Sequence, residues 1–254
     1  MRRKNRTAVA LVATLAFVAA ACGGDDASDA VPEERTATVV VPAADAVPGS
    51  DQPAEELVRF TTPDGEELEG TVHGEGPIGI VLAHMRGRDR STWTSFARAA
   101  ATEGHQVLRF DFRGYGGSSG EADTQLDVDL IAAVSFLANR GVSDVVVMGA
   151  SMGATATVNV AAQIDLAAAV SLSAPADFQG LAALAVAAQV NEPLLVIAAE
   201  NDQPYAGAAV EFDAAAPASQ LQIFSGNAHG TNLFNEHEAA LTNLLLDFVA
   251  NRVG

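Results

Sequence analysis

Six nearly continuous apolar runs constrain the fold of this chain more than any other feature of its sequence. Short runs of this kind are typical of strands that helices cover on both faces of a parallel sheet. Helical patterns lie between the runs, and such alternation predicts an α/β fold with a doubly wound, mostly parallel sheet of about eight strands. The expected strands cover residues 78–83, 106–110, 144–148, 167–172, 193–199 and 220–224, and the expected helices cover 91–103, 124–139, 152–162, 180–189, 205–215 and 236–251.

Two further strands are expected at an antiparallel entry edge of the sheet. Residues 56–61 and 66–73 flank the turn Pro63-Asp64-Gly65, and this arrangement predicts a hairpin. We therefore expect the folded domain to cover residues 55–254.

Composition excludes several classes of protein and of site. The chain has 14 Lys and Arg against 32 Asp and Glu, a net charge of −18, so it offers little basic surface for nucleic acid. Its single Cys excludes an internal disulfide framework, a Cys-built zinc site and an iron–sulfur cluster. The five His are scattered without metal-ligand spacing. We expect no metal and no cofactor.

The N-terminus has the pattern of an export signal. Four of residues 2–6 are basic, and residues 8–21 form an apolar run too short to span a bilayer as a helix. Residues 1–21 are therefore expected to be a signal peptide, whose removal would change the net charge from −18 to about −22. The end of the run fits an ordinary secretory cleavage site and also resembles a bacterial lipobox, with Ala19 where Leu is usual and Cys22 as the lipidated residue. We favour an outward-facing lipoprotein, anchored to the bacterial cell membrane through Cys22, over a soluble secreted protein.

Residues 22–54 are expected to be a disordered tether. Ala, Asp, Glu, Pro and Val dominate this stretch, prolines interrupt it repeatedly, and no helical period survives. Its acidic side chains repel one another and favour extended conformations. Such a tether would hold the following domain away from a membrane surface.

The pattern G-x-S-x-G, in which a serine occupies a tight turn, occurs twice. Ser151 follows the apolar residues 145–148 and precedes a helical pattern, so it has the strand, turn and helix that a nucleophile elbow needs. Ser118 lies in a Gly-rich loop whose following residues are polar. We interpret Ser151 as the nucleophile and Ser118 as a loop residue.

These motifs resemble those of the α/β-hydrolase superfamily over essentially all of residues 55–254. Residues 111–118, Asp-Phe-Arg-Gly-Tyr-Gly-Gly-Ser, are similar to the D-x-R-G-x-G-x-S loop after the family's fourth strand. His84 and Met85 occupy the position of its H-G oxyanion motif, with Met85 in place of Gly. Among the smaller branches, the chain looks closest to dienelactone-hydrolase-like and peptidase-like members. Cap domains of this family usually follow the sixth strand, where only residues 175–192 are available, so no large cap is expected.

The resemblance implies a chain order of nucleophile, acid and base, and the sequence supplies both partners of Ser151. Asp202 follows the fifth apolar run, and His229 lies between the last strand and the last helix. Glu200 and Asp177 are alternative acids. An imidazole is needed to take the serine proton, and a carboxylate is needed to orient the imidazole and to stabilise its charged form.

The oxyanion of an acyl-transfer intermediate needs preset hydrogen-bond donors. We expect these donors to be the backbone N–H groups of Met85 and Met152. A Met in place of Gly at position 85 keeps the amide but narrows the space around it. The expected partner is a small-molecule acyl substrate.

Other polar and aromatic residues near these motifs have structural interpretations. His84 is expected to shape the oxyanion loop, and Trp93 either lines the site or packs in the core. Three arginines beside this loop could recognise an anionic group, although we favour a solvated loop in which they pair with Asp89. These are Arg86, Arg88 and Arg90, while the remaining histidines, His73, His105 and His237, are expected at strand edges or on the surface.

The sequence therefore predicts an extracytoplasmic serine hydrolase, most simply a carboxylic ester hydrolase with Ser151, His229 and Asp202 as its triad. A serine peptidase is one alternative. A catalytically silent member of the fold, with a binding or envelope-associated role, is the other. The complete set of three residues favours an enzyme, because a degenerate copy would be expected to have lost one of them.

Overall fold

The computed structural model describes residues 54–253. The predicted signal peptide, Cys22 and all but the last residue of the predicted tether lie outside these residues. The described part contains, in chain order, β1 (Glu55–Thr61), β2 (Glu67–His73), β3 (Ile78–Ala83), η1 (Arg90–Trp93), α1 (Thr94–Thr102), β4 (Gln106–Phe110), α2 (Leu126–Ala138), β5 (Asp144–Ala150), α3 (Met152–Ala161), β6 (Ala168–Leu172), α4 (Ala183–Val186), η2 (Ala187–Gln189), β7 (Leu194–Ala199), α5 (Tyr205–Ala215), β8 (Ser219–Phe224), η3 (Gly230–Asn232) and α6 (Leu233–Val253), where η marks a 3-10 helix.

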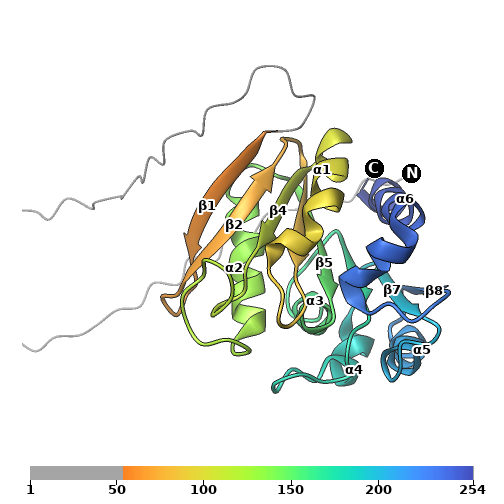
Figure 1. Ribbon diagram of the computed structural model, residues 1–254. Helices are drawn as coiled ribbons and strands as arrows, with labels where there is room; N and C mark the ends of the chain where they lie inside the picture. The colour runs from red at the N-terminus through yellow and green to blue at the C-terminus, as the bar shows by residue number, and fades with distance from the viewer. Residues whose placement is uncertain (1–53, 254) are drawn as a thin grey trace, which may run out of the picture. The chain divides into compact units, whose positions relative to one another are not determined.

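The eight strands form one sheet in the order β1-β2-β4-β3-β5-β6-β7-β8. β1 and β2 make the expected antiparallel hairpin, β2 is also antiparallel to β4, and every later pair is parallel. Figure 1 shows the sheet running from β1 on the left to β8 on the right. The predicted doubly wound, mostly parallel sheet is confirmed.

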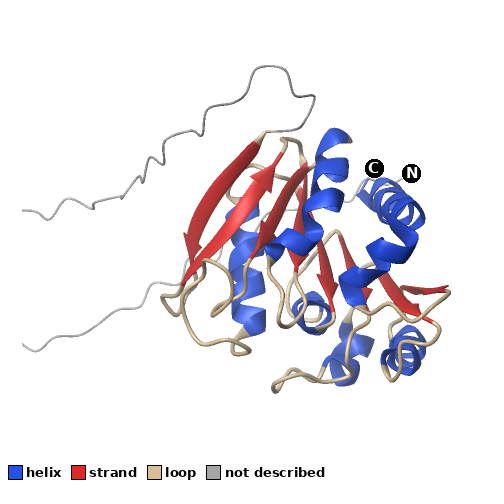
Figure 2. Cartoon of the chain, viewed as in Figure 1, coloured by secondary structure: helices blue, strands red, loops and turns tan. Residues whose placement is uncertain are grey.

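Helices cover both faces of this sheet, and each face has its own hydrophobic core (Figure 2). α1 and α6 contribute to one core, and α2 to α5 contribute to the other. β5 shows why its apolar run is continuous: Val146 and Met148 belong to the first core, and Val147 belongs to the second. A strand covered on both faces has no solvent side, so its sequence does not alternate.

β8 is less buried than its apolar sequence predicts. It pairs only with β7 and forms an edge of the sheet. Its residues are half-buried or exposed, and Ile223 is 37% exposed. The expectation of burial on both faces is therefore wrong for this strand, because it stands at an edge of the sheet and its run contains the polar residues Gln220 and Gln222.

The segment between β6 and β7 contains only short helices. α4 and η2 replace the single helix expected over residues 180–189, because Phe178 and Leu181 pair in an isolated β-bridge. No large cap is inserted at this point of the described chain, as predicted.

α6 begins at Leu233, three residues before the expected start, and His237 interrupts it with a non-helical φ of −135°. Leu241, Leu245 and Phe248 are buried on the face that meets the sheet. Among residues 54–253, no helix combines the length and the apolar character needed to cross a membrane.

Candidate active site

Ser151 lies on the sharp turn that joins β5 to α3. Its φ of 50° and ψ of −113° place the backbone outside the ordinary helical and extended regions, and such a conformation is strained for a residue with a Cβ atom. The Ser151 N–H donates to the carbonyl of Leu172, at the end of β6, at 2.8 Å. This bond ties the turn to the sheet.

The two glycines of the G-x-S-x-G pattern are required by close backbone approaches around this turn. A Cβ atom on Gly149 would lie 2.2 Å from the Gly153 carbonyl oxygen. A Cβ atom on Gly153 would lie 2.5 Å from the carbonyl oxygen of Ala83 and 2.7 Å from that of His84. α3 therefore begins directly against the end of β3, and only glycine fits at this contact.

Gly153→Ala is expected to lower the free energy of unfolding by about 1–3 kcal/mol, because backbone atoms on both sides must shift to admit the methyl group. Gly207→Ala is the matched control. Gly207 is exposed in α5, and the nearest atom to an added Cβ is 3.8 Å away, so alanine is expected to stabilise by about 0.5–1 kcal/mol. Urea unfolding of both variants measures the two shifts. A Gly153→Ala protein as stable as the Gly207→Ala protein would contradict the proposed packing.

Three loops at the carboxyl ends of parallel strands bring Ser151, His229 and Asp202 together. Asp202 follows β7, and His229 follows β8. His229 Nε2 lies 2.8 Å from Ser151 Oγ, and His229 Nδ1 lies 2.9 Å from Asp202 Oδ2 and 3.1 Å from Oδ1. The side chain of Asp202 is 7% exposed and that of His229 is 25% exposed. The carboxylate is thus buried behind an imidazole whose Nε2 faces the serine hydroxyl.

Two residues that the sequence analysis did not identify support the His229 loop. The buried Ser173, after β6, accepts a hydrogen bond at 3.0 Å from the N–H of Gly230. The ring of Tyr205, at the start of α5, lies 4.2 Å from the His229 ring, measured between centroids. Neither residue belongs to a local motif, because each acts on a segment far away in the chain.

The alternative acids do not contact His229. Glu200 is exposed, and its Oε1 accepts hydrogen bonds from Gly226 N and Asn201 Nδ2, both at 3.3 Å. Asp177 is exposed in the loop after β6. Of the three carboxylates considered, only Asp202 has the geometry to orient the imidazole.

Ser118 lies in a loop, as expected, and its hydroxyl has a structural task. Its Oγ donates to the Asp111 carbonyl at 2.7 Å and accepts from the N–H of Glu69 at 2.9 Å. These bonds join the loop after β4 to β2. No histidine contacts this hydroxyl in the described chain, so Ser118 lacks a base.

The two amides expected to form the oxyanion hole are available as donors. Met152 is the first residue of α3, where an N–H group has no partner within the helix. In residues 54–253, no hydrogen bond from Met85 N or Met152 N to another protein group is found. The Met85 side chain is buried, and Thr231 Oγ1 lies 3.3 Å from its sulfur. That side chain therefore lies beneath the loop that carries His229.

His84 holds the loop that carries Met85. It is fully buried, its Nδ1 lies 2.9 Å from the Met85 carbonyl, and its Nε2 accepts from the N–H of Phe112 at 3.0 Å. Burial lowers the pKa of His84, so the ring stays neutral with its proton on Nδ1. The imidazole thereby fastens the residue before Met85 to the end of β4.

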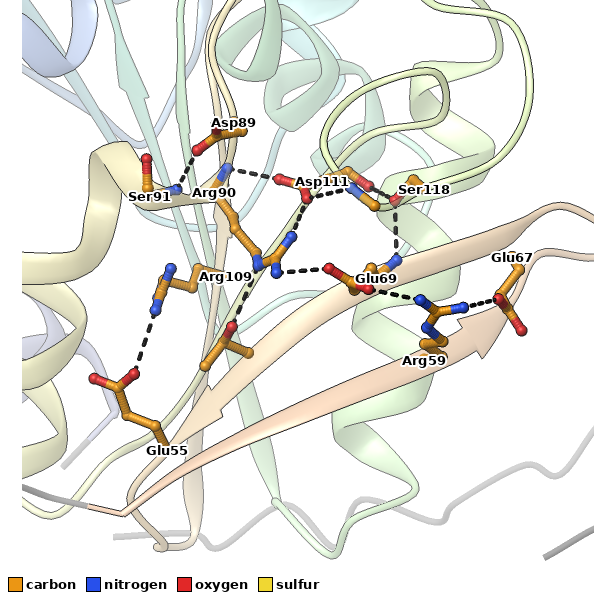
Figure 3. A network of polar contacts seen from close by, with 12 residues as sticks. Glu55, Arg59, Glu67, Glu69, Asp89, Arg90, Ser91, Arg109, Asp111 and Ser118 are labelled. Carbon is orange, nitrogen blue, oxygen red and sulfur yellow. Dashed lines mark hydrogen bonds and ion pairs between the residues drawn. The ribbon is translucent and has the colours of Figure 1, made fainter. Parts of the chain in front are cut away.

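Two of the three arginines beside this loop, Arg86 and Arg90, pair with carboxylates other than the expected Asp89. Arg90 pairs with the buried Asp111 and, at 2.7 Å, with Glu69, as Figure 3 shows. Asp89 instead caps η1 by accepting from the N–H of Ser91 at 2.8 Å. The expected pairing with Asp89 is thus wrong, because the Asp89 carboxylate caps the N-terminus of η1 instead. Arg86 pairs with Asp123, and the exposed Arg88 lines a groove with Thr92 and Asn232.

Two other residues near these elements are fully buried. His73 is fully buried, not at an exposed strand edge, and its Nε2 accepts from Arg109 Nε at 2.7 Å. Burial and the neighbouring Arg109 lower the pKa of His73 to about 4, which keeps the ring neutral and able to accept. Trp93 packs in the core, and its indole N–H donates to the Ala83 carbonyl at 3.1 Å. Trp93 thus fixes the end of β3, and the alternative that it lines the site is wrong.

The arrangement suits covalent acyl transfer. A hydroxyl, a base and a buried carboxylate lie in one hydrogen-bonded line, and free amides border the turn that carries the hydroxyl. No group of three or more potential metal ligands occurs among residues 54–253.

The sequence model of the alpha/beta hydrolase family matches residues 80–245. An uncharacterized protein of Mycobacterium tuberculosis is 34% identical over 134 residues, which are 48% of this chain and 47% of that protein. The chain thus spans about half the length of the curated relatives it matches.

Solved structures share the fold over most of the described residues. An esterase of Pyrococcus furiosus superimposes with a TM-score of 0.70 at 19% identity, covering 80% of this chain and 94% of that one. The enol-lactonase of Burkholderia xenovorans superimposes with a TM-score of 0.66 at 18% identity, covering 76% of this chain and all (100%) of that one. At identities below 20%, these two structures show a shared fold and nothing more specific.

Proposed function

Because this chain belongs to the alpha/beta hydrolase family, we propose that it is a serine hydrolase that cleaves small carboxylic esters through an acyl-enzyme. The line of hydrogen bonds from Ser151 through His229 to Asp202 carries this proposal. A lone serine hydroxyl is a weak nucleophile at neutral pH. A hydroxyl 2.8 Å from an imidazole that a buried carboxylate orients is an activated one.

In the proposed reaction, Ser151 Oγ attacks the ester carbonyl carbon while its proton passes to His229 Nε2. The carbonyl π electrons move to oxygen, and the Met85 and Met152 amides stabilise the resulting oxyanion. Collapse of the intermediate breaks the C–O bond, and the imidazolium gives its proton to the departing alkoxide. Water then attacks the acyl-enzyme with His229 as base, releasing the acid and restoring Ser151.

The shape of the site and the comparisons are compatible with small substrates. No large cap follows β6, so an open site for short or flexible acyl groups is proposed. The structural neighbours described as an esterase and an enol-lactonase make ester hydrolysis the first activity to assay. We also propose that the chain belongs to a dienelactone-hydrolase-like branch of the family.

Covalent labelling with a fluorophosphonate probe tests the proposal. The purified domain should gain one probe adduct, and peptide mass spectrometry should assign it to the peptide that contains Ser151. Ser118→Ala should label like the wild type. A folded wild-type protein that takes no label would refute the hydrolase and favour the binding role.

We further propose that the protein acts outside the cytoplasm, as a lipoprotein anchored through Cys22. The basic and apolar residues before Cys22 support export, and its position at the end of the apolar run supports lipidation. Expression of the full chain in a bacterial host, followed by fractionation, tests this proposal. Wild type should sediment with membranes and Cys22→Ser should not; equal distribution of the two would contradict lipid anchoring.

A further inference from the structure

The two amides of the proposed oxyanion hole are held very differently. Met152 belongs to α3 and is fixed by the helix and by the glycine contacts of the elbow. Met85 lies in an irregular loop whose next three residues, 86–88, are exposed, with Gly87 at a φ of 69°. His84 fastens the loop before Met85. A matching anchor after Met85 is needed if its amide is to keep a fixed direction.

Arg86 provides that anchor through a chain of polar contacts. Its Nε and its Nη2 each lie 2.7 Å from Asp123 Oδ2. The Tyr115 hydroxyl donates to Asp123 Oδ1 at 2.5 Å and lies 4.0 Å from the sulfur of the fully buried Met152. Side chains thus connect the residue after Met85 to the residue after Ser151.

Several features keep this connection in place. Asp123 adopts a left-handed φ of 64°, which aspartate tolerates better than most residues, and its side chain is only 13% exposed. Burial and the Asp123 carboxylate raise the pKa of Tyr115, so the phenol remains a donor. The Arg86 guanidinium also lies 5.7 Å above the centre of the Phe178 ring. Loops that follow β3, β4 and β6 therefore meet at Arg86.

We infer that Tyr115, Asp123 and Arg86 form a positioning relay, which sets the direction of the Met85 amide relative to the Ser151 elbow. This inference rests on the proposed serine hydrolase function. The relay touches neither Ser151 nor His229 in the described contacts, so it acts through Met85 and Met152. Because an oxyanion forms only during the reaction, a misdirected amide lowers kcat and leaves KM nearly unchanged.

The test measures kcat and KM for p-nitrophenyl acetate in Arg86→Gln, Asp123→Asn and the double variant. Loss of a whole oxyanion donor costs about 10²- to 10³-fold, and misdirection of one donor is expected to cost about tenfold in kcat. Because both substitutions break the same link, the double variant should also lose about tenfold, whereas independent effects would multiply to about a hundredfold. Arg86→Lys should recover part of kcat, since an ammonium can still pair with Asp123 but without the two-pronged contact.

Arg140→Gln is the matched control. Arg140 also pairs with a carboxylate, Glu56, at 2.5 Å, and it too lies 5.7 Å from the centre of an aromatic ring, that of Phe136. It lies away from the elbow, just after the end of α2, so its loss should leave both constants unchanged. Wild-type kcat in Arg86→Gln and Asp123→Asn, together with inactive Ser151→Ala, would overturn the relay and spare the proposed function. Absence of turnover in the wild type would overturn both.

Discussion

Ser151→Ala should lower kcat for p-nitrophenyl acetate by about 10⁶-fold, because the variant lacks the atom that is proposed to form the acyl-enzyme. The Ser151 hydroxyl makes its side-chain hydrogen bond with His229 Nε2 at 2.8 Å. In the alanine variant, His229, Asp202 and both amides stay in place. The residual rate then measures what the oxyanion donors and substrate binding supply without a nucleophile. Steady-state kinetics, with labelling by the fluorophosphonate probe as a second readout, checks the prediction.

The same substitution should lower the free energy of unfolding by at most about 1 kcal/mol. Alanine retains a Cβ atom, so the strained φ of 50° costs about the same in both proteins, and one half-exposed hydrogen bond contributes about 1 kcal/mol.

Ser118→Ala should affect stability more than activity, because the Ser118 hydroxyl joins Asp111 to Glu69 through two hydrogen bonds. It should lose stability and keep kcat. An active Ser151→Ala protein beside an inactive, folded Ser118→Ala protein would mean that the other G-x-S-x-G motif carries the nucleophile.

Sequence patterns predicted those parts of the molecule whose causes are local. β5 and β7 are continuous apolar runs because helices cover both of their faces. Gly149 and Gly153 mark the elbow because a Cβ atom at either position would collide with backbone atoms at this sharp turn. The choice of Asp202 and His229 depended on chain order within a family resemblance. Spacing alone did not specify these two residues.

What the sequence did not predict depends on contacts between distant segments. Ser173 supports Gly230 across 57 positions of the chain, and Arg86 reaches Asp123 across 37. Neither pair produces a periodic pattern in the amino-acid sequence. His73 shows the same limit, because the Arg109 side chain that donates to it belongs to the neighbouring strand β4. The role of such residues can be recognised only when the fold places their partners beside them.

Asp202→Asn should reduce kcat by about 10⁴-fold while leaving the fold intact. The Asp202 carboxylate accepts from the N–H at His229 Nδ1, which leaves Nε2 unprotonated and able to take the serine proton. An asparagine side chain can donate to Nδ1 instead, and that bond favours the tautomer with its proton on Nε2. A protonated Nε2 donates to Ser151 Oγ and cannot act as its base. Labelling by the fluorophosphonate probe should slow in parallel with kcat.

Glu200→Gln is the matched control for this experiment, because it removes one charge two residues away and keeps the size of the side chain. Glu200 is exposed and bonds only its own loop and Gly226, so kcat should change less than about twofold. Both variants lose one negative charge near the site. A difference in kcat between them therefore reports the hydrogen bond to His229 Nδ1 and not the loss of charge. If Glu200→Gln lost activity and Asp202→Asn kept it, the acid would be misassigned. Loss of activity in both would indicate that charge, and not the tautomer, governs His229.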